Sequence, residues 1–208
     1  MFKKFYVFSV VLCSFFVGFP AYTNECISYK IKPKITINIP EYTYDVIQPR
    51  QTMNLLHGNV VATLVNNYDI VADITSVEDG YCVGLKAINA TIGYNDFLVK
   101  IDKRHKLHSC SFNAILAHEN MHIDAYLSVI DDYKTELYNS LYSAADSVMP
   151  IFVEKQSELN NAVEKLNNEL QSHPDIILMI QKIHAAEEIK NKTIDQNEDY
   201  STLKKCMK

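Results

Sequence analysis

Two histidines four residues apart, with a glutamate directly after the first, form the clearest chemical pattern in this 208-residue chain. The stretch HENMH contains His118, Glu119 and His122. Residues four apart share one face of an α-helix, so both imidazoles can bind the same metal ion. Glu119 lies about 100° around that helix from His118, which lets it reach a water on the metal without being a ligand. The pattern predicts a zinc hydrolase in which Glu119 is the general base.

The alternative interpretation is a solvated helix face with two unrelated histidines, because short motifs also occur by chance. Two features favour the metal site. The motif begins a long stretch in which apolar residues follow helical spacing. Its neighbours Ala117, Asn120 and Met121 carry no charge that would compete for the metal.

The other histidines are weaker candidates for metal binding. His105 and His108 lie close together but are interpreted as exposed loop residues, and His57 is interpreted as a loop residue. His184 and Glu188 have the four-residue spacing of a ligand pair, although a solvated helix face is the simpler interpretation.

The segment LAHENMHIDA resembles the zincin metallopeptidases, and more narrowly the small exported bacterial zinc-dependent proteases. As in those proteins, a cysteine (Cys110) precedes the motif and a long helical segment follows. The C-terminal stretch TIDQNEDYSTLKKC is similar to a recurring tail whose aspartate, tyrosine and cysteine match Asp195, Tyr200 and Cys206. The resemblance implies a zincin-like fold, a Zn²⁺ cofactor and a peptide or protein substrate.

The sequence also departs from zincin patterns. The metzincin subclass is excluded, since Ala125 and Ser128 stand where that pattern needs glycine and histidine. Zincins place an apolar residue where Asp124 stands here. Because Asp124 points away from the histidine face, we expect it to pair with an arginine such as Arg50 or Arg104.

The third zinc ligand must come from a segment that returns to the motif helix. If the helices after Pro150 run back antiparallel to it, the returning chain reaches the level of His118 at roughly residue 182, because both legs rise equally per residue. That count favours His184, Glu187 or Glu188.

The resemblance instead implies Asp195 as the third ligand, with Tyr200 nearby to contact the substrate oxyanion or the zinc. A kink expected at Pro174 makes the helical count uncertain by a turn or more. We therefore predict Asp195 as the ligand, with Glu188 as the second choice.

Hydrophobic periodicity predicts an α+β fold. Alternating apolar residues between about residues 27 and 103 indicate a small antiparallel sheet. Helical spacing then begins near Cys110 and continues to Pro150, and two further helices follow, the last beginning near Pro174. The elements that must position the site are thus an N-terminal sheet, a long motif helix and two more helices.

The N-terminal residues have the features of a secretory signal peptide. Lys3 and Lys4 precede an apolar run over residues 5–19, and small or polar residues follow. We predict a signal peptide at 1–23 and a single domain at 24–208; a retained anchor is the alternative. The net charge of −5 would become more negative after cleavage, which makes the protein a poor candidate for binding nucleic acid or an anionic membrane by charge.

Four cysteines follow the signal segment: Cys26, Cys82, Cys110 and Cys206. An even number in an oxidising compartment predicts two disulfides, with three possible pairings. We favour Cys82–Cys110 and Cys26–Cys206. A zinc site made of cysteines is disfavoured because no C-x-x-C pair exists.

Together these features predict a secreted or periplasmic zinc metallopeptidase without stable membrane insertion. One alternative is an exported protein that binds zinc for structure and uses its helices for interaction. Another is an amidase or peptidase acting on cell-wall peptides, with the same chemistry on a different substrate.

Overall fold

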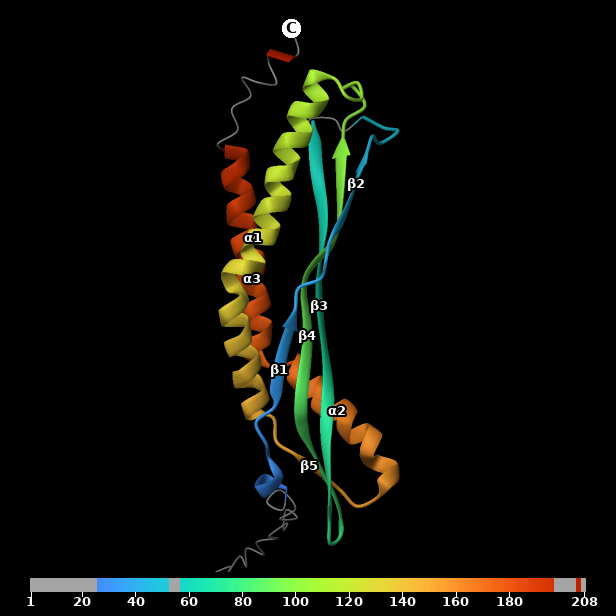
Figure 1. Cartoon of the computed structure of the whole chain (residues 1–208), viewed down its shortest axis with the longest axis vertical. Helices are drawn as coiled ribbons and strands as arrows, with labels where there is room; N and C mark the ends of the chain where they lie inside the picture. The colour runs from blue at the N-terminus through green and yellow to red at the C-terminus, as the bar shows by residue number, and fades with distance from the viewer. Residues whose placement is uncertain (1–25, 53–56, 197–204, 207–208) are drawn as a thin grey trace, which may run out of the picture.

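The structure is a computed structural model, and it describes residues 26–52, 57–196 and 205–206. Both the predicted signal peptide and Tyr200 lie outside the described residues. The predicted α+β class is confirmed: four strands of a five-stranded sheet come first along the chain, and the fifth strand lies between the first and second of three α-helices (Figure 1). Within the described ranges, no helix is long and apolar enough to cross a membrane.

The long strand β4 (Gly80–Ile101) is the centre of the sheet. One of its edges pairs antiparallel with β3 (Gly58–Val77) over almost its whole length. Its other edge carries three short strands in succession: β5 (Ile151–Val153), β1 (Lys34–Asn38) and β2 (Thr43–Ile47). The pairs of β1 and β2 with β4 are parallel, which differs from the wholly antiparallel sheet expected from the sequence.

The motif helix α1 (Cys110–Ser147) begins where Ser109 caps it, since Ser109 Oγ accepts a hydrogen bond from the Phe112 N–H. No glycine or proline interrupts it, and it ends shortly before Pro150. A helical turn leads into α2 (Leu159–Gln171), and α3 (Pro174–Gln196) begins with proline at its first position, where a missing N–H costs nothing.

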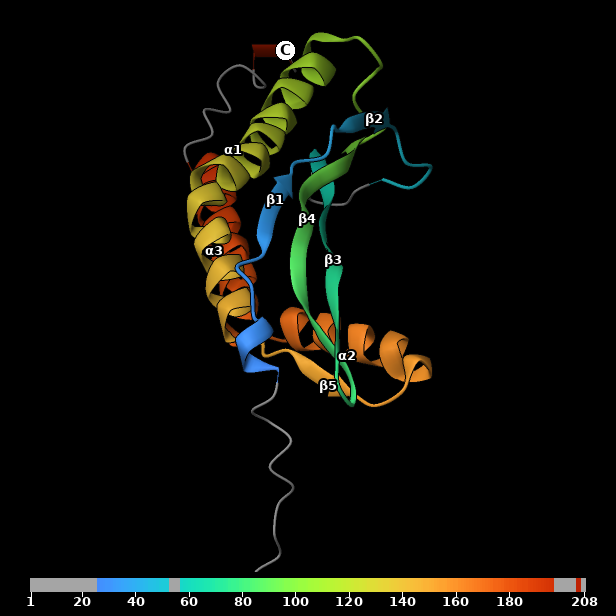
Figure 2. The ribbon, with the colours of Figure 1, turned by 60° about the horizontal axis from the view of Figure 1, so that its bottom comes forward.

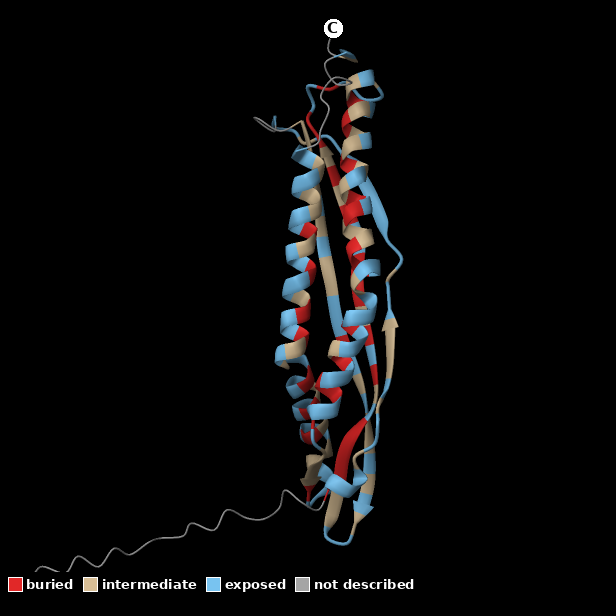
Figure 3. Cartoon of the chain, turned by 90° about the vertical axis from the view of Figure 1, so that its left-hand side faces the viewer, coloured by how far each residue is buried: buried red, intermediate tan, exposed pale blue. Residues whose placement is uncertain are grey.

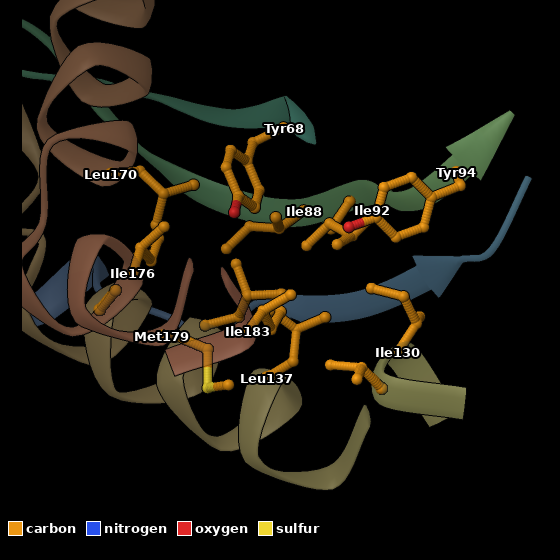
Figure 4. Packing of buried hydrophobic residues seen from close by; sticks show 14 of the residues in the cluster. Tyr68, Ile88, Ile92, Tyr94, Ile130, Leu137, Leu170, Ile176, Met179 and Ile183 are labelled. Carbon is orange, nitrogen blue, oxygen red and sulfur yellow. The ribbon is translucent and has the colours of Figure 1, made fainter. Parts of the chain in front are cut away.

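The helices share one hydrophobic core with one face of the sheet. On β4 the residues that face the helices are almost fully buried, among them Ile88, Ile92 and Tyr94 (Figure 4). Helices α1 and α3 lie side by side along this face, and their buried residues turn toward each other and the sheet (Figure 3). Helix α2 runs across the lower part of the sheet instead (Figure 2).

Helix α3 runs antiparallel to α1, and polar contacts fix their alignment. Near the start of α3, Ser143 Oγ donates to Asp175 Oδ2 at 2.7 Å. Further along, Lys190 Nζ donates to Asp132 Oδ2 at 2.6 Å and to Ser128 Oγ at 2.8 Å. The last residues of α3 lie opposite His118 and His122, in the first half of α1.

Two disulfides are present, as predicted, but the favoured pairing is wrong. Cys26 pairs with Cys82, and Cys110 pairs with Cys206. Strand β1 runs parallel to β4, so the chain before it lies beside the beginning of β4, where Cys82 stands. Cys110 follows the opposite end of β4, and the strand from Cys82 to that end is roughly 60 Å long at about 3.3 Å per residue. The two cysteines of the predicted bridge Cys82–Cys110 therefore cannot meet.

We predict that replacing both Cys26 and Cys82 by alanine lowers the free energy of unfolding by about 2–4 kcal/mol, because the bridge closes a long loop. Denaturant unfolding measures this loss. Mass mapping of the non-reduced protein should recover linked peptides containing Cys26–Cys82 and Cys110–Cys206. Linked peptides that join Cys82 to Cys110 would contradict the pairing.

Candidate metal site

The structure brings Asp195 of α3 beside His118 and His122 of α1. The Nε2 atoms of the two histidines lie 3.1 Å apart. Asp195 Oδ1 lies 3.2 Å from His122 Nε2 and 3.5 Å from His118 Nε2. Among the described residues, this is the one group of three side chains with the composition and spacing to hold a metal ion. The histidine side chains are mostly buried, and the aspartate side chain is 62% exposed.

The donor set and spacing fit a small divalent ion. Two imidazole nitrogens and one carboxylate oxygen are ligands that zinc accepts, and such a set leaves a fourth position open. Ligands about 2.0–2.1 Å from a tetrahedral zinc ion lie roughly 3.3 Å from one another. The three separations of 3.1, 3.2 and 3.5 Å lie close to that value. These residues could therefore close around a zinc ion with little movement.

Glu119 turns from α1 toward the first residue of β3. Its side chain is buried, and a Cβ added to Gly58 would lie 2.5 Å from Glu119 Oε1 and 2.7 Å from Ile115 Cγ2. Only a glycine at position 58 leaves this space for the carboxylate. The sheet thus determines where the Glu119 carboxylate lies.

A hydrogen-bonded network lies behind His122. Asn191 Oδ1 lies 2.7 Å from His122 Nδ1, and Asn191 Nδ2 donates to the Glu187 carbonyl oxygen at 2.9 Å. The buried Glu187 carboxylate accepts from the Tyr94 hydroxyl and lies 3.1 Å from His184 Nδ1. Burial and this carboxylate raise the pKa of Tyr94, so its hydroxyl stays protonated and donates.

A shallow groove of about 480 Å³ runs between α1 and α3 beside the histidines and aspartate. Its apolar lining includes Met121, Ala125, Ile189 and Ile194. Met121 and Ile189 are largely exposed, so the groove presents apolar surface to solvent. Met121 and Ile194, which line it, are the sequence neighbours of His122 and Asp195. Such a groove can accept an apolar side chain of a bound molecule.

The other predicted candidates for the third ligand do not reach the histidines. Glu187 is buried against Tyr94, His184 pairs with Glu187, and Glu188 is exposed. The count of helical residues from Pro150 predicted that a residue near 182 would lie opposite the histidines, whereas Asp195 lies there. The returning leg begins only at Pro174, since α2 leaves the line of α1 to cover the sheet (Figure 2).

His105 does not lie in an exposed loop. It is 5% exposed, and its Nε2 atom lies 2.9 Å from Nδ1 of His57, which directly precedes β3. Burial, and then the neighbouring His57, lower the pKa of His105. His108 lies apart from this pair, against Phe112. Sequence reasoning missed the His57–His105 contact because the β3–β4 pairing creates it.

The prediction that Asp124 pairs with Arg50 or Arg104 is also wrong. Arg104 Nε pairs with the buried Asp102 at 2.9 Å. Asp124 is exposed at the edge of the groove, and within the described part of the chain it forms no ion pair.

Sequence reasoning also missed Asn191, although Asn191 lies four residues before Asp195 and so shares its face of α3.

No protein family, curated protein or solved structure matches this chain. The interpretation of the site therefore depends on its own geometry.

We predict that Gly58→Ala lowers the free energy of unfolding by about 1–3 kcal/mol, because the added methyl group overlaps the Glu119 carboxylate. Gly84→Ala is the matched control, since its methyl group would lie 3.6 Å from Pro150 Cγ, an ordinary contact. Thermal or denaturant unfolding of both variants makes the comparison. Equal stability of the two variants would show that the Glu119 carboxylate does not pack against Gly58.

Proposed function

We propose that this chain is a zinc-dependent peptidase. The observation that carries the proposal is the meeting of His118, His122 and Asp195 at the separations of a zinc site. Glu119 follows the first of these residues in the sequence. The resemblance of LAHENMHIDA to zincins supports the same chemistry. The apolar groove beside the site supports a peptide or protein substrate that places an apolar side chain there.

His118, His122 and Asp195 would hold the zinc ion, which would supply Lewis-acid polarisation of the carbonyl and activation of a water molecule. Glu119 accepts a proton from the water as its oxygen bonds to the peptide carbonyl carbon. Glu119 then gives this proton to the leaving nitrogen as the C–N bond breaks, which yields a carboxylic acid and an amine. Burial against Gly58 limits the movement of this carboxylate. Tyr200 is proposed to contact the substrate oxyanion.

The two disulfides indicate an oxidising compartment. Together with the signal-like N-terminal segment, they support a secreted or periplasmic enzyme. The acidic net charge supports a protein or peptide partner rather than nucleic acid.

We predict that Asp195→Ala weakens zinc binding at least about tenfold, because it removes one of three ligands. Glu188→Ala is the matched control, since Glu188 is an exposed carboxylate on the same helix. Competition titration with a chromophoric chelator measures both affinities. His118→Ala should lose zinc as well. A loss of affinity in Glu188→Ala alone would refute the assignment of Asp195.

We predict that Glu119→Gln retains zinc but loses hydrolysis by about 10²–10⁴-fold, because an amide keeps the shape of the side chain without accepting the proton. The measurements are zinc stoichiometry and cleavage of an unfolded protein substrate by the same preparation. Full activity in this variant would remove Glu119 from the mechanism. Zinc binding without any cleavage by the wild type would instead favour a structural metal.

A further inference from the structure

The side chain of Asn191 has one possible orientation in this structure. Its Nδ2 atom lies 2.9 Å from the Glu187 carbonyl oxygen, which can only accept a hydrogen bond. The amide NH₂ group must therefore face the helix backbone, and the amide oxygen must face His122. The Glu187 carbonyl oxygen thus assigns the orientation of the amide.

The orientation of Asn191 decides which nitrogen of His122 carries the proton. The amide oxygen of Asn191 can only accept, so His122 Nδ1, 2.7 Å away, must donate. The form of His122 that binds a metal has one N–H group, so donation from Nδ1 leaves the lone pair for the metal on Nε2. That nitrogen faces His118 Nε2 at 3.1 Å and Asp195 Oδ1 at 3.2 Å, where the metal is expected.

We propose that Asn191 is a positioning residue that holds His122 in the Nδ1–H tautomer, with Nε2 ready to bind a metal. This inference rests on the proposed function, because it takes His122 as a metal ligand. A hydrogen-bond acceptor behind a histidine ligand fixes the tautomer and the ring orientation, and removal of such a partner weakens metal binding about 10- to 100-fold.

One face of helix α3 thus contributes two residues to the site: Asp195, and Asn191 one turn before it. Its own position is fixed another turn earlier, where the buried Glu187 carboxylate meets the Tyr94 hydroxyl on β4. A shift of α3 along α1 would separate both Asn191 and Asp195 from the histidines.

The test begins with the protonated nitrogen of His122 in the metal-free protein. Long-range ¹H–¹⁵N correlation spectra of ¹⁵N-histidine-labelled full chain at neutral pH report which ring nitrogen carries hydrogen. We expect the Nδ1–H tautomer in the wild type and a mixture of both tautomers in Asn191→Leu. An Nε2–H tautomer in the wild type would overturn the proposal without any variant.

Zinc affinity, measured by chelator competition, is the second readout. We expect Asn191→Leu to bind zinc about 10- to 100-fold more weakly than the wild type. Asn191→Asp keeps an acceptor at the same place, and it should retain the Nδ1–H tautomer and bind zinc within about threefold of the wild type, or more tightly. If Asn191→Leu does not fold, Asn191→Asp and the wild-type tautomer still decide the question.

Thr193→Val is the matched control. Thr193 Oγ1 donates to the Ile189 carbonyl four residues earlier, as Asn191 Nδ2 does to Glu187, but among the described residues it bonds to no histidine. We expect unchanged zinc affinity in this variant. Equal losses in Thr193→Val and Asn191→Leu would show that a helix contact, and not the acceptor, matters. A wild type that binds no zinc would refute the proposed function, whereas an Nε2-protonated His122 refutes the role of Asn191 alone.

Discussion

The antiparallel packing of α3 on α1 is the constraint on which the candidate site depends. A single helix can place His118 and His122 on one face, but its own later residues move away along the axis. A third ligand must therefore come from a second helix, and that helix must be aligned along α1 to within one helical turn. Asp195 meets this condition because α3 begins opposite the end of α1 and ends opposite its start.

Buried polar contacts explain why this alignment is specific. Burial of apolar side chains such as Leu137 in the shared core contributes about 1.5–3 kcal/mol per side chain, but apolar burial has no directional requirement that would fix the alignment. The Glu187 carboxylate fixes the alignment, because a shift of one turn would leave it buried without the hydrogen bond from the Tyr94 hydroxyl. The network that sets the alignment of the helices therefore also presents His122, through Asn191, to the site.

The sheet has two roles for the helices. Its long central strand gives α1 and α3 one continuous buried face, and the start of β3 sets the position of Glu119 through Gly58. The disulfides secure the two ends of this arrangement. Cys26–Cys82 holds the N-terminal segment beside the beginning of β4, and Cys110–Cys206 links the C-terminal segment to the first residue of α1.

The sequence by itself determined the features that depend on local periodicity. Period-two alternation marked the sheet, and helical spacing with Pro150 and Pro174 marked the three helices, because side-chain direction repeats with the local backbone. The pair His118 and His122, and Glu119 beside them, followed from helix geometry alone. The number of disulfides followed from counting cysteines.

Only the tertiary structure decided which distant segments meet. The parallel pairing of β1 with β4 placed Cys26 beside Cys82, and the pairing of β3 with β4 brought His57 to His105. The departure of α2 from the line of α1 decided that Asp195, and not a residue near His184, reaches the histidines. These contacts depend on strand order and helix direction, which long-range packing sets and local spacing does not encode.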